Sequence, residues 1–179
     1  FDQYTIAGDE ITDFTYNYVP GTETVKDTTV YNYKKEDGSN NSLRAFQVSK
    51  DTEVMSMSHS YIGNSLTLVN GQYVSDPNYN YPPKSTTFYY SKADSMRGDE
   101  VMDFTESYVI DYESGTQPLG KLVSEKTYYD YGDAMLRADQ ISLYADEPLT
   151  RSRTYGYDNN SKQDTNLRSE SFYEGYKGE

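Results

Sequence analysis

A long internal match constrains the fold of this chain more than any single residue does. Residues 8–19 read GDEITDFTYNYV and residues 98–109 read GDEVMDFTESYV, so Gly, Asp, Glu, Asp, Phe, Thr, Tyr and Val recur in the same order. The last eight residues resemble residues 1–10 and begin the pattern again. Self-similarity of this kind is the sequence signature of repeat architectures. We therefore expect two units and the start of a third, at residues 1–87, 88–171 and 172–179.

Composition excludes several classes of protein. The net charge is −13, with Lys+Arg 16 against Asp+Glu 29. This balance argues against a nucleic-acid partner, because such binding depends on basic side chains that neutralise phosphates. No window approaches the roughly 18 consecutive apolar residues that span a bilayer, so we expect no membrane insertion. The chain has no Cys and therefore no disulfide framework.

Tyrosine takes the place of aliphatic residues in this chain. The hydrophobic fraction is 35%, whereas the aromatic fraction is 15%, with Tyr 21 and Trp 0. A tyrosine offers a large apolar ring and a hydroxyl that stays in contact with water. Such side chains suit a structure in which nearly every residue lies near solvent. The composition therefore favours a thin sheet or solenoid over a thick globular core.

Alternation of apolar and polar residues dominates the chain. Phe14, Tyr16 and Tyr18 fall on one face of a strand, and residues 55–61 alternate in the same way. Alternation over about four to eight residues is typical of half-buried strands. Turn signals such as Asn70-Gly71 separate the runs, because these residues supply the positive φ of tight hairpins. We predict an all-β fold of tandem antiparallel β-hairpin repeats, a solenoid-like sheet with Tyr-rich faces.

A shorter pattern recurs inside the units. A Thr-Tyr strand is followed by a turn that contains Asp, and then by a dipeptide that ends in Arg. We interpret each copy as one hairpin whose return strand begins at that dipeptide. The dipeptides are Leu43-Arg44, Met96-Arg97, Leu136-Arg137 and Leu167-Arg168.

This pattern resembles the tyrosine–aspartate (YD, RHS-type) repeats of bacterial surface and toxin-shell proteins. The resemblance rests on the four patches of tyrosine strand, Asp turn and Leu-Arg or Met-Arg dipeptide. It implies a long array of β-hairpins on a secreted or cell-surface protein. Because the chain begins and ends inside a repeat unit, we also expect it to be a segment of a longer or processed polypeptide.

The sequence offers little for catalysis. His59 is the single histidine, and a catalytic histidine needs a positioned nucleophile or carboxylate partner. The pairs Asp9-Glu10 and Asp99-Glu100 could supply two carboxylates, but adjacent strand residues point to opposite faces. Their duplication also favours a structural role. We therefore predict that the protein is not an enzyme.

Acidic side chains in the predicted turns make calcium the most credible metal. Ca²⁺ binds carboxylate and amide oxygens, although no EF-hand loop is present. The alternative is turn chemistry, in which Asp and Asn accept hydrogen bonds from their own backbone. We favour the alternative and expect no obligatory cofactor. The calcium candidates are Asp37, Asp94, Asp99, Asp133 and Asp158.

The expected function is structural. Stacked repeat units bury surface only against their neighbours, so terminal units need a cap or a partner. We predict a subunit of an extracellular filament, sheath or surface fibre, whose copies join head to tail through β-strands. The alternative is a surface adhesin segment that binds carbohydrate through exposed tyrosines, with calcium in the turns. The residues predicted to mediate packing and assembly are Phe14, Tyr16, Tyr18, Tyr31, Tyr33, Phe104, Tyr108, Tyr129, Tyr131, Tyr155 and Tyr157.

Overall fold

The computed structural model describes residues 11–39, 41–111, 120–141 and 147–174. These residues form β-strands, one 3₁₀ turn and loops, which confirms the predicted all-β class. The elements are β1 (Phe14–Tyr18), β2 (Val25–Tyr33), η1 (Ala45–Gln47), β3 (Met55–Ile62), β4 (Leu66–Val69), β5 (Gln72–Ser75), β6 (Ser85–Tyr90), β7 (Val101–Asp111), β8 (Gly120–Tyr131), β9 (Leu136–Arg137), β10 (Leu149–Asp158) and β11 (Gln163–Phe172).

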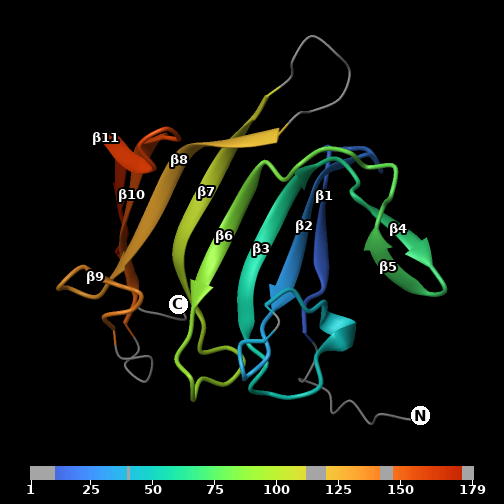
Figure 1. Ribbon diagram of the computed structural model, residues 1–179, viewed down its shortest axis with the longest axis horizontal. Helices are drawn as coiled ribbons and strands as arrows, with labels where there is room; N and C mark the ends of the chain where they lie inside the picture. The colour runs from blue at the N-terminus through green and yellow to red at the C-terminus, as the bar shows by residue number, and fades with distance from the viewer. Residues whose placement is uncertain (1–10, 40, 112–119, 142–146, 175–179) are drawn as a thin grey trace.

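The strands build one long antiparallel sheet. Its order is β1-β2-β3-β6-β7-β8-β10-β11, with β9 paired to β8 beside this path, while β4 and β5 form a separate hairpin. Figure 1 shows the strands side by side, with β10 and β11 at one end and the β4–β5 hairpin beyond the β1 end. Within the described residues the sheet is open, and no solenoidal closure is present.

Local sequence explains why these segments are strands. β2 is rich in Thr, Val and Tyr, whose branched or aromatic side chains suit a pleated surface. Thr28 and Val30 are buried, while their neighbours on β2 are half-buried. Asn70 and Gly71 join β4 to β5 with φ angles of 51° and 81°. Positive φ at both positions is what a tight two-residue hairpin requires, so the predicted turn signal is confirmed.

Buried apolar side chains are few, and they gather where strands end. Tyr131, Ala138 and Ile141 form a buried cluster, which Leu149 and neighbouring side chains cover. A similar group, Tyr33, Leu43 and Val54, lies where β2 meets β3. Most other residues of the sheet interior are only half-buried. This distribution suits a thin sheet.

The sheet divides into two halves of matching register. We call β1, β2, β3 and β6 the first half, and β7, β8, β10 and β11 the second half. In both halves the second and third strands carry a bulge at the same place in the pairing. The matched pairs are Tyr33–Met55 with Tyr131–Leu149, Asn32–Met57 with Asp130–Arg151, and Val30–His59 with Tyr128–Arg153.

The outer strands of the two halves match as well. Phe14 lies opposite Val30, as Phe104 lies opposite Tyr128. On the other side, β6 pairs with β3 as β11 pairs with β10. The matched pairs there are Met57–Phe88 with Arg151–Phe172, Ser58–Thr87 with Ser152–Ser171, and Ser60–Ser85 with Thr154–Ser169.

The structure changes one detail of the predicted hairpins. Leu43 makes an isolated bridge to Tyr33, and Leu136-Arg137 forms only the two-residue strand β9. The long return strands are β3 and β10, which begin later in the chain, so the Leu-Arg dipeptides do not open them. The expected unit boundaries at 87/88 and 171/172 fall inside β6 and β11. The division into units stays a prediction.

Candidate functional site

An aspartate–arginine pair recurs at the same place in both halves. Arg44 donates from Nε and Nη2 to the carboxylate of Asp13, at 2.8 and 2.7 Å, and Arg137 pairs with Asp103. Each aspartate directly precedes the Phe-Thr of the repeated sequence, and each arginine belongs to a Leu-Arg dipeptide. Hydrogen bonds between charged groups are the stronger ones in proteins. This pair fastens the loop after the second strand to the first strand.

A tyrosine hydroxyl makes a second recurring contact. Tyr33 donates to the carbonyl of Thr12 at 2.6 Å, and Tyr131 donates to the carbonyl of Met102 at 2.7 Å. Both rings are buried, with exposed fractions of 2% and 5%. Burial, with a smaller contribution from Glu100, raises the pKa of Tyr33 to about 12, and burial also raises the pKa of Tyr131. These two tyrosines are therefore part of the fold of their own half.

A third recurring contact is an ion pair, and its basic residue in the second half was grouped with a different motif in the sequence analysis. Lys84 pairs with Asp27 at 2.6 Å, and Arg168 pairs with Glu125 at 2.8 Å. Each basic residue stands directly before a Ser-x-x-Phe-Tyr segment, at residues 85–89 and 169–173. Arg168 therefore occupies the place of Lys84, although sequence analysis grouped it with the Leu-Arg dipeptides.

A longer motif that sequence analysis missed surrounds the Leu-Arg dipeptides. Residues 43–47 read LRAFQ and residues 136–140 read LRADQ. The Gln47 side chain accepts a hydrogen bond from the backbone of Arg44 at 2.9 Å, and Gln140 does the same for Arg137 at 3.0 Å. The shared Ala and Gln were visible in the sequence and could have revealed this turn.

The two halves meet in the pairing of β6 with β7, which we call the joint. Phe88 and Phe104 stack across it, with ring centroids 4.6 Å apart and planes 22° apart. On the opposite face, the hydroxyls of Thr87 and Thr105 lie 2.9 Å apart. Backbone pairing, this aromatic stack and this hydroxyl contact all contribute to the joint.

Each outer strand of the sheet has one partner strand among the described residues. β1 pairs with β2, and β11 pairs with β10. All ten residues of β11 are exposed, and Phe172 has an exposed fraction of 64%. β1 corresponds to β7, and β11 corresponds to β6. The two outer strands therefore repeat the two strands that pair with each other in the joint.

The predicted assembly residues of β1 lie together. Phe14, Tyr16 and Tyr18 form a chain of ring contacts, with centroid distances of 4.9 and 6.3 Å. Tyr73 of β5 packs against Phe14 at 4.8 Å, and Tyr18 has an exposed fraction of 52%. Tyr18 is therefore exposed on the outer strand, whereas Phe14 and Tyr16 are half-buried and Phe14 is in contact with Tyr73.

The other predicted residues lie inside the sheet. Phe104 belongs to the joint, and Tyr155 packs edge-on against Tyr128.

Lys126 lies over the ring of Tyr157, 4.6 Å from its centroid, and Tyr108 donates to Glu106 at 2.9 Å. The Tyr129 hydroxyl contacts Thr105 at 3.1 Å, and Tyr31 is half-buried on β2. Their strands pair with neighbours on both sides. Their predicted role in assembly is not tested by these contacts.

A groove of about 550 Å³ lies on one face of the first half. Its walls come from β2, β3, the β4–β5 hairpin and the following loop, and they include Tyr61, Tyr79, Tyr81, Asp76 and Arg44. Tyr79 stands edge-on to Tyr61 and to Tyr81, with centroid distances of 5.8 and 5.6 Å. The groove thus combines a tyrosine wall with charged and amide groups.

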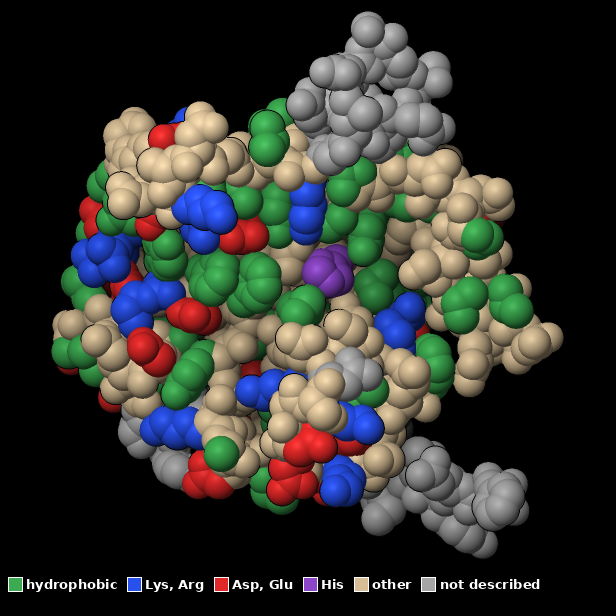
Figure 2. All heavy atoms as spheres, viewed as in Figure 1, with side chains coloured by type: hydrophobic (Ala, Val, Ile, Leu, Met, Phe, Trp, Pro, Cys, Tyr) green, Lys and Arg blue, Asp and Glu red, His purple; other side chains and the backbone are tan. Residues whose placement is uncertain are grey.

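His59 lies on this face of the sheet, and Figure 2 shows the single histidine among hydrophobic side chains. Its Nδ1 atom is 2.9 Å from the hydroxyl of Thr86 on the neighbouring strand. Burial, and then the charge of Lys121, lower the pKa of His59. These contacts hold the side chain within the sheet.

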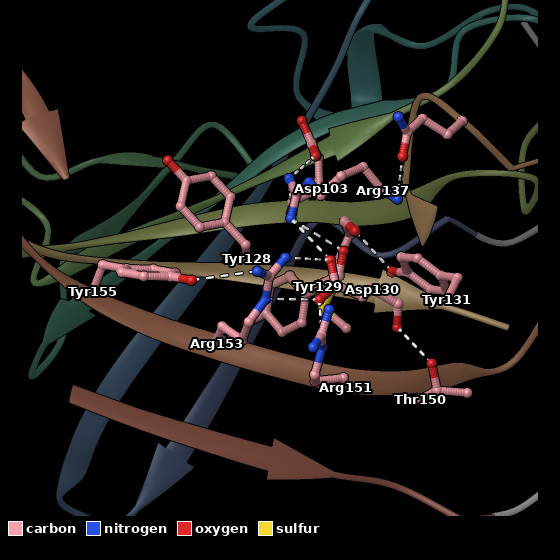
Figure 3. A network of polar contacts seen from close by, with 12 residues as sticks. Asp103, Tyr128, Tyr129, Asp130, Tyr131, Arg137, Thr150, Arg151, Arg153 and Tyr155 are labelled. Atoms are coloured by element: carbon pink, nitrogen blue, oxygen red, sulfur yellow. Dashed lines mark hydrogen bonds and ion pairs between the residues drawn. The ribbon is translucent and has the colours of Figure 1, made fainter. Parts of the chain in front are cut away.

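A buried carboxylate network occupies the second half (Figure 3). Asp130 has an exposed fraction of 0% and accepts bonds from Nε of Arg151 and of Arg153, both at 2.9 Å. Nη1 of Arg137 lies 3.9 Å from Oδ1 of Asp130, and the Arg137 guanidinium group also stands over the ring of Tyr128. A carboxylate this deeply buried needs such partners. The corresponding residues in the first half are Asn32, Met57 and His59, and none carries a fixed charge.

The calcium candidates lie in separate turns. The carboxylates of Asp37 and Asp158 accept the backbone N–H two residues on, at 2.8 and 3.0 Å. Side-chain hydrogen bonds from Ser39 and Ser161, and then the backbone N–H bonds, lower the pKa of Asp37 and Asp158. Asp99 accepts the N–H of Met96, and Asp133 lies exposed beside a second hollow at the end of β8.

The remaining acidic candidates have contacts of their own. Asp94 also has a polar or electrostatic interaction. Among the described residues, no group of three or more His, Asp or Glu side chains could hold a metal. Of the duplicated acidic pairs, Asp9-Glu10 lies outside the described residues, whereas Glu100 accepts N–H bonds from Met55 and Gly98.

Comparisons with protein-family models, with curated proteins and with solved structures found no match. The resemblance to tyrosine–aspartate repeats therefore stays a prediction. In the described part of the chain, no helix has the length and apolar character to cross a membrane.

Proposed function

We propose that this chain is a structural repeat protein, the subunit of an extracellular or cell-surface filament, sheath or fibre. Its tandem antiparallel hairpin units would continue from one copy to the next, head to tail. One observation carries the proposal. The joint between β6 and β7 connects two matching halves edge to edge. Among the described residues, β11 and β1 each have one unpaired edge, and they correspond to the two sides of the joint.

Physical chemistry supports assembly at these edges. An open strand presents unpaired backbone N–H and C=O groups that another strand can satisfy. The contact is heterologous, since it joins β11 of one copy to β1 of the next, and such contacts produce open filaments when they do not close. The net charge of −13 would limit lateral clumping of the filaments. We assign no catalytic role and no nucleic-acid partner.

Sedimentation velocity tests the proposal with two matched variants. We expect the unmodified protein to sediment as large assemblies at neutral pH, and Phe172→Lys to sediment as a monomer. Leu167→Lys is the control, because Leu167 is also an exposed residue of β11, at 48%, but lies outside the stretch that corresponds to the joint. Monomeric unmodified protein at high concentration would contradict the proposal.

Calcium has a separate readout in the same experiment. Joints made of backbone pairing and aromatic stacking should persist when EDTA is added. Assemblies that dissolve only with the chelator would place calcium at the joints.

The groove of the first half favours a second candidate function, carbohydrate binding by an adhesin segment. Tyrosine rings can stack on the apolar faces of sugars, while the polar walls supply hydrogen-bond partners. Tyr81 is 48% exposed at this groove. A glycan array should then lose its signal with Tyr81→Ala and keep it with Tyr173→Ala, a similarly exposed tyrosine of the second half. The absence of any glycan signal would remove this candidate.

A further inference from the structure

The joint inside the chain has a defined register. Phe88 lies opposite Phe104, Thr87 opposite Thr105, and Ser85 opposite Ser107. Register in a sheet fixes which side chains share a face, and a shift by one residue reverses every face. The stacked phenylalanines and the paired threonine hydroxyls therefore occur in this register alone.

The open strand β11 repeats the β6 side of this joint. Phe172 corresponds to Phe88, because each lies opposite the matching residue of the third strand, Arg151 or Met57. By the same pairing, Ser171 corresponds to Thr87 and Ser169 corresponds to Ser85. The part of β11 before Ser169 contains register shifts against β10, so its regular stretch is the one that matches the joint.

The open strand β1 repeats the β7 side. Its Phe14 and Thr15 lie opposite β2 as Phe104 and Thr105 lie opposite β8. Asn17 stands where Ser107 stands in β7. Both edges therefore carry a phenylalanine on one face and small polar side chains on the other.

Charge is compatible with this pairing. In the joint, Thr86 lies opposite Glu106, so only one residue of this pair is charged. Between copies in the same register, Glu170 would lie opposite Tyr16, and again only one residue of the pair would be charged. Like charges placed directly opposite would destabilise a strand pair, and this register places none together.

From these correspondences, and on the basis of the proposed function, we infer that β11 of one copy pairs with β1 of a second copy in the register of the joint. Phe172 lies opposite Phe14, Ser171 opposite Thr15, and Ser169 opposite Asn17. The partner is thus a second copy of this chain, and each contact between copies repeats the β6–β7 pairing.

Cysteine crosslinking tests the register directly, because the chain has no cysteine of its own. Residues opposite each other in antiparallel strands have Cα atoms about 4.5–5.5 Å apart, a separation that a disulfide spans. The four positions Thr15, Asn17, Ser169 and Ser171 are all exposed, so cysteine should fit at each.

Four double variants form a matched set. Thr15→Cys with Ser171→Cys, and Asn17→Cys with Ser169→Cys, should give ladders of crosslinked copies with oxidised glutathione on a non-reducing gel. Asn17→Cys with Ser171→Cys, and Thr15→Cys with Ser169→Cys, are shifted by two residues and should give at least tenfold less product. β1 and β11 lie at opposite ends of the sheet, so a ladder reports contacts between copies.

The outcomes separate the register from the function. Filaments in which the shifted pairs crosslink, or in which only dimers form, would overturn the inferred register and leave the structural function standing. Monomers without any ladder would overturn both. Matched ladders that disappear with Phe172→Lys, and persist with Leu167→Lys, would support the register and the place of Phe172 in it.

Discussion

The two halves of the sheet share their strand order and three recurring contacts. They differ in one connecting segment and in one group of polar side chains. Both halves keep the Asp–Arg pair, the buried tyrosine hydroxyl and the basic residue before Ser-x-x-Phe-Tyr. The first half adds residues 63–84, which hold the β4–β5 hairpin and wall the groove, whereas a tight turn at 159–162 joins the same two strands in the second half. The second half instead buries Asp130 among arginines.

This difference separates two kinds of residue. The shared contacts join the first strand, the second strand with the loop that follows it, and the fourth strand, and they recur in both halves. The residues that differ lie on one face of the sheet. Asp130, Arg151 and Arg153 of the second half stand at the positions that Asn32, Met57 and His59 occupy in the first half. Exchanging Asp130 alone would take the shared carboxylate from two partly buried guanidinium groups, so we expect these residues to be exchanged as a group.

The largest expected effect comes from a substitution that breaks the buried network around Asp130. Asp130→Asn installs the residue of the first half and should lower the free energy of unfolding by about 3 kcal/mol, because two guanidinium groups lose their carboxylate. The triple variant with Arg151→Met and Arg153→His should recover most of this loss. Urea unfolding in the Phe172→Lys background, expected to be monomeric, measures both. Equal stability of the single and triple variants would contradict the exchange as a group.

The shared Asp–Arg pair should be worth the same in each half. We expect Asp13→Ala and Asp103→Ala each to cost about 2 kcal/mol, since each removes charged hydrogen bonds. Amide hydrogen exchange should show faster exchange within the half that carries the substitution. A variant that leaves exchange unchanged would show that the pair has no equivalent role there.

High pH should weaken both halves through their buried tyrosines. The unfolded pKa of tyrosine is about 10, whereas the pKa of Tyr33 is about 12 in the folded protein. The folded state holds this proton more tightly, so its stabilising contribution is complete below pH 10 and is lost as the pH rises toward 12. Tyr33→Phe and Tyr131→Phe should each cost about 1 kcal/mol at neutral pH. Unfolding midpoints at pH 8, 10 and 11 should then fall less steeply in both variants than in the parent.

The smallest effect concerns the ion pairs of Lys84 and Arg168, whose basic side chains are exposed to solvent. Lys84→Met and Arg168→Met should each cost less than about 1 kcal/mol, because such pairs are solvated. Raising the salt concentration should shrink the difference from the parent protein further. A cost well above this in one half alone would show that the two pairs are not equivalent.

Much of the strand content could be predicted from sequence, because alternation acts locally. Residues 55–61 and the turn at Asn70-Gly71 were predicted correctly. The partners of Asp13 and Asp103 could not be predicted, since Arg44 and Arg137 reach them across the sheet. Arg168 was grouped with the other arginines because it follows a leucine, which is a pattern of only two residues. The longer Ser-x-x-Phe-Tyr segment that follows Arg168 relates it to Lys84 instead.

Electron cryomicroscopy of the unmodified protein tests the central claim most directly. Eight strands along the main path, spaced about 4.8 Å apart, predict filaments with an axial repeat of about 38 Å and a weaker half-repeat near about 19 Å. Both repeats follow from copies that join as the two halves join. Discrete particles, or filaments whose axial repeat does not correspond to eight strands, would contradict the account.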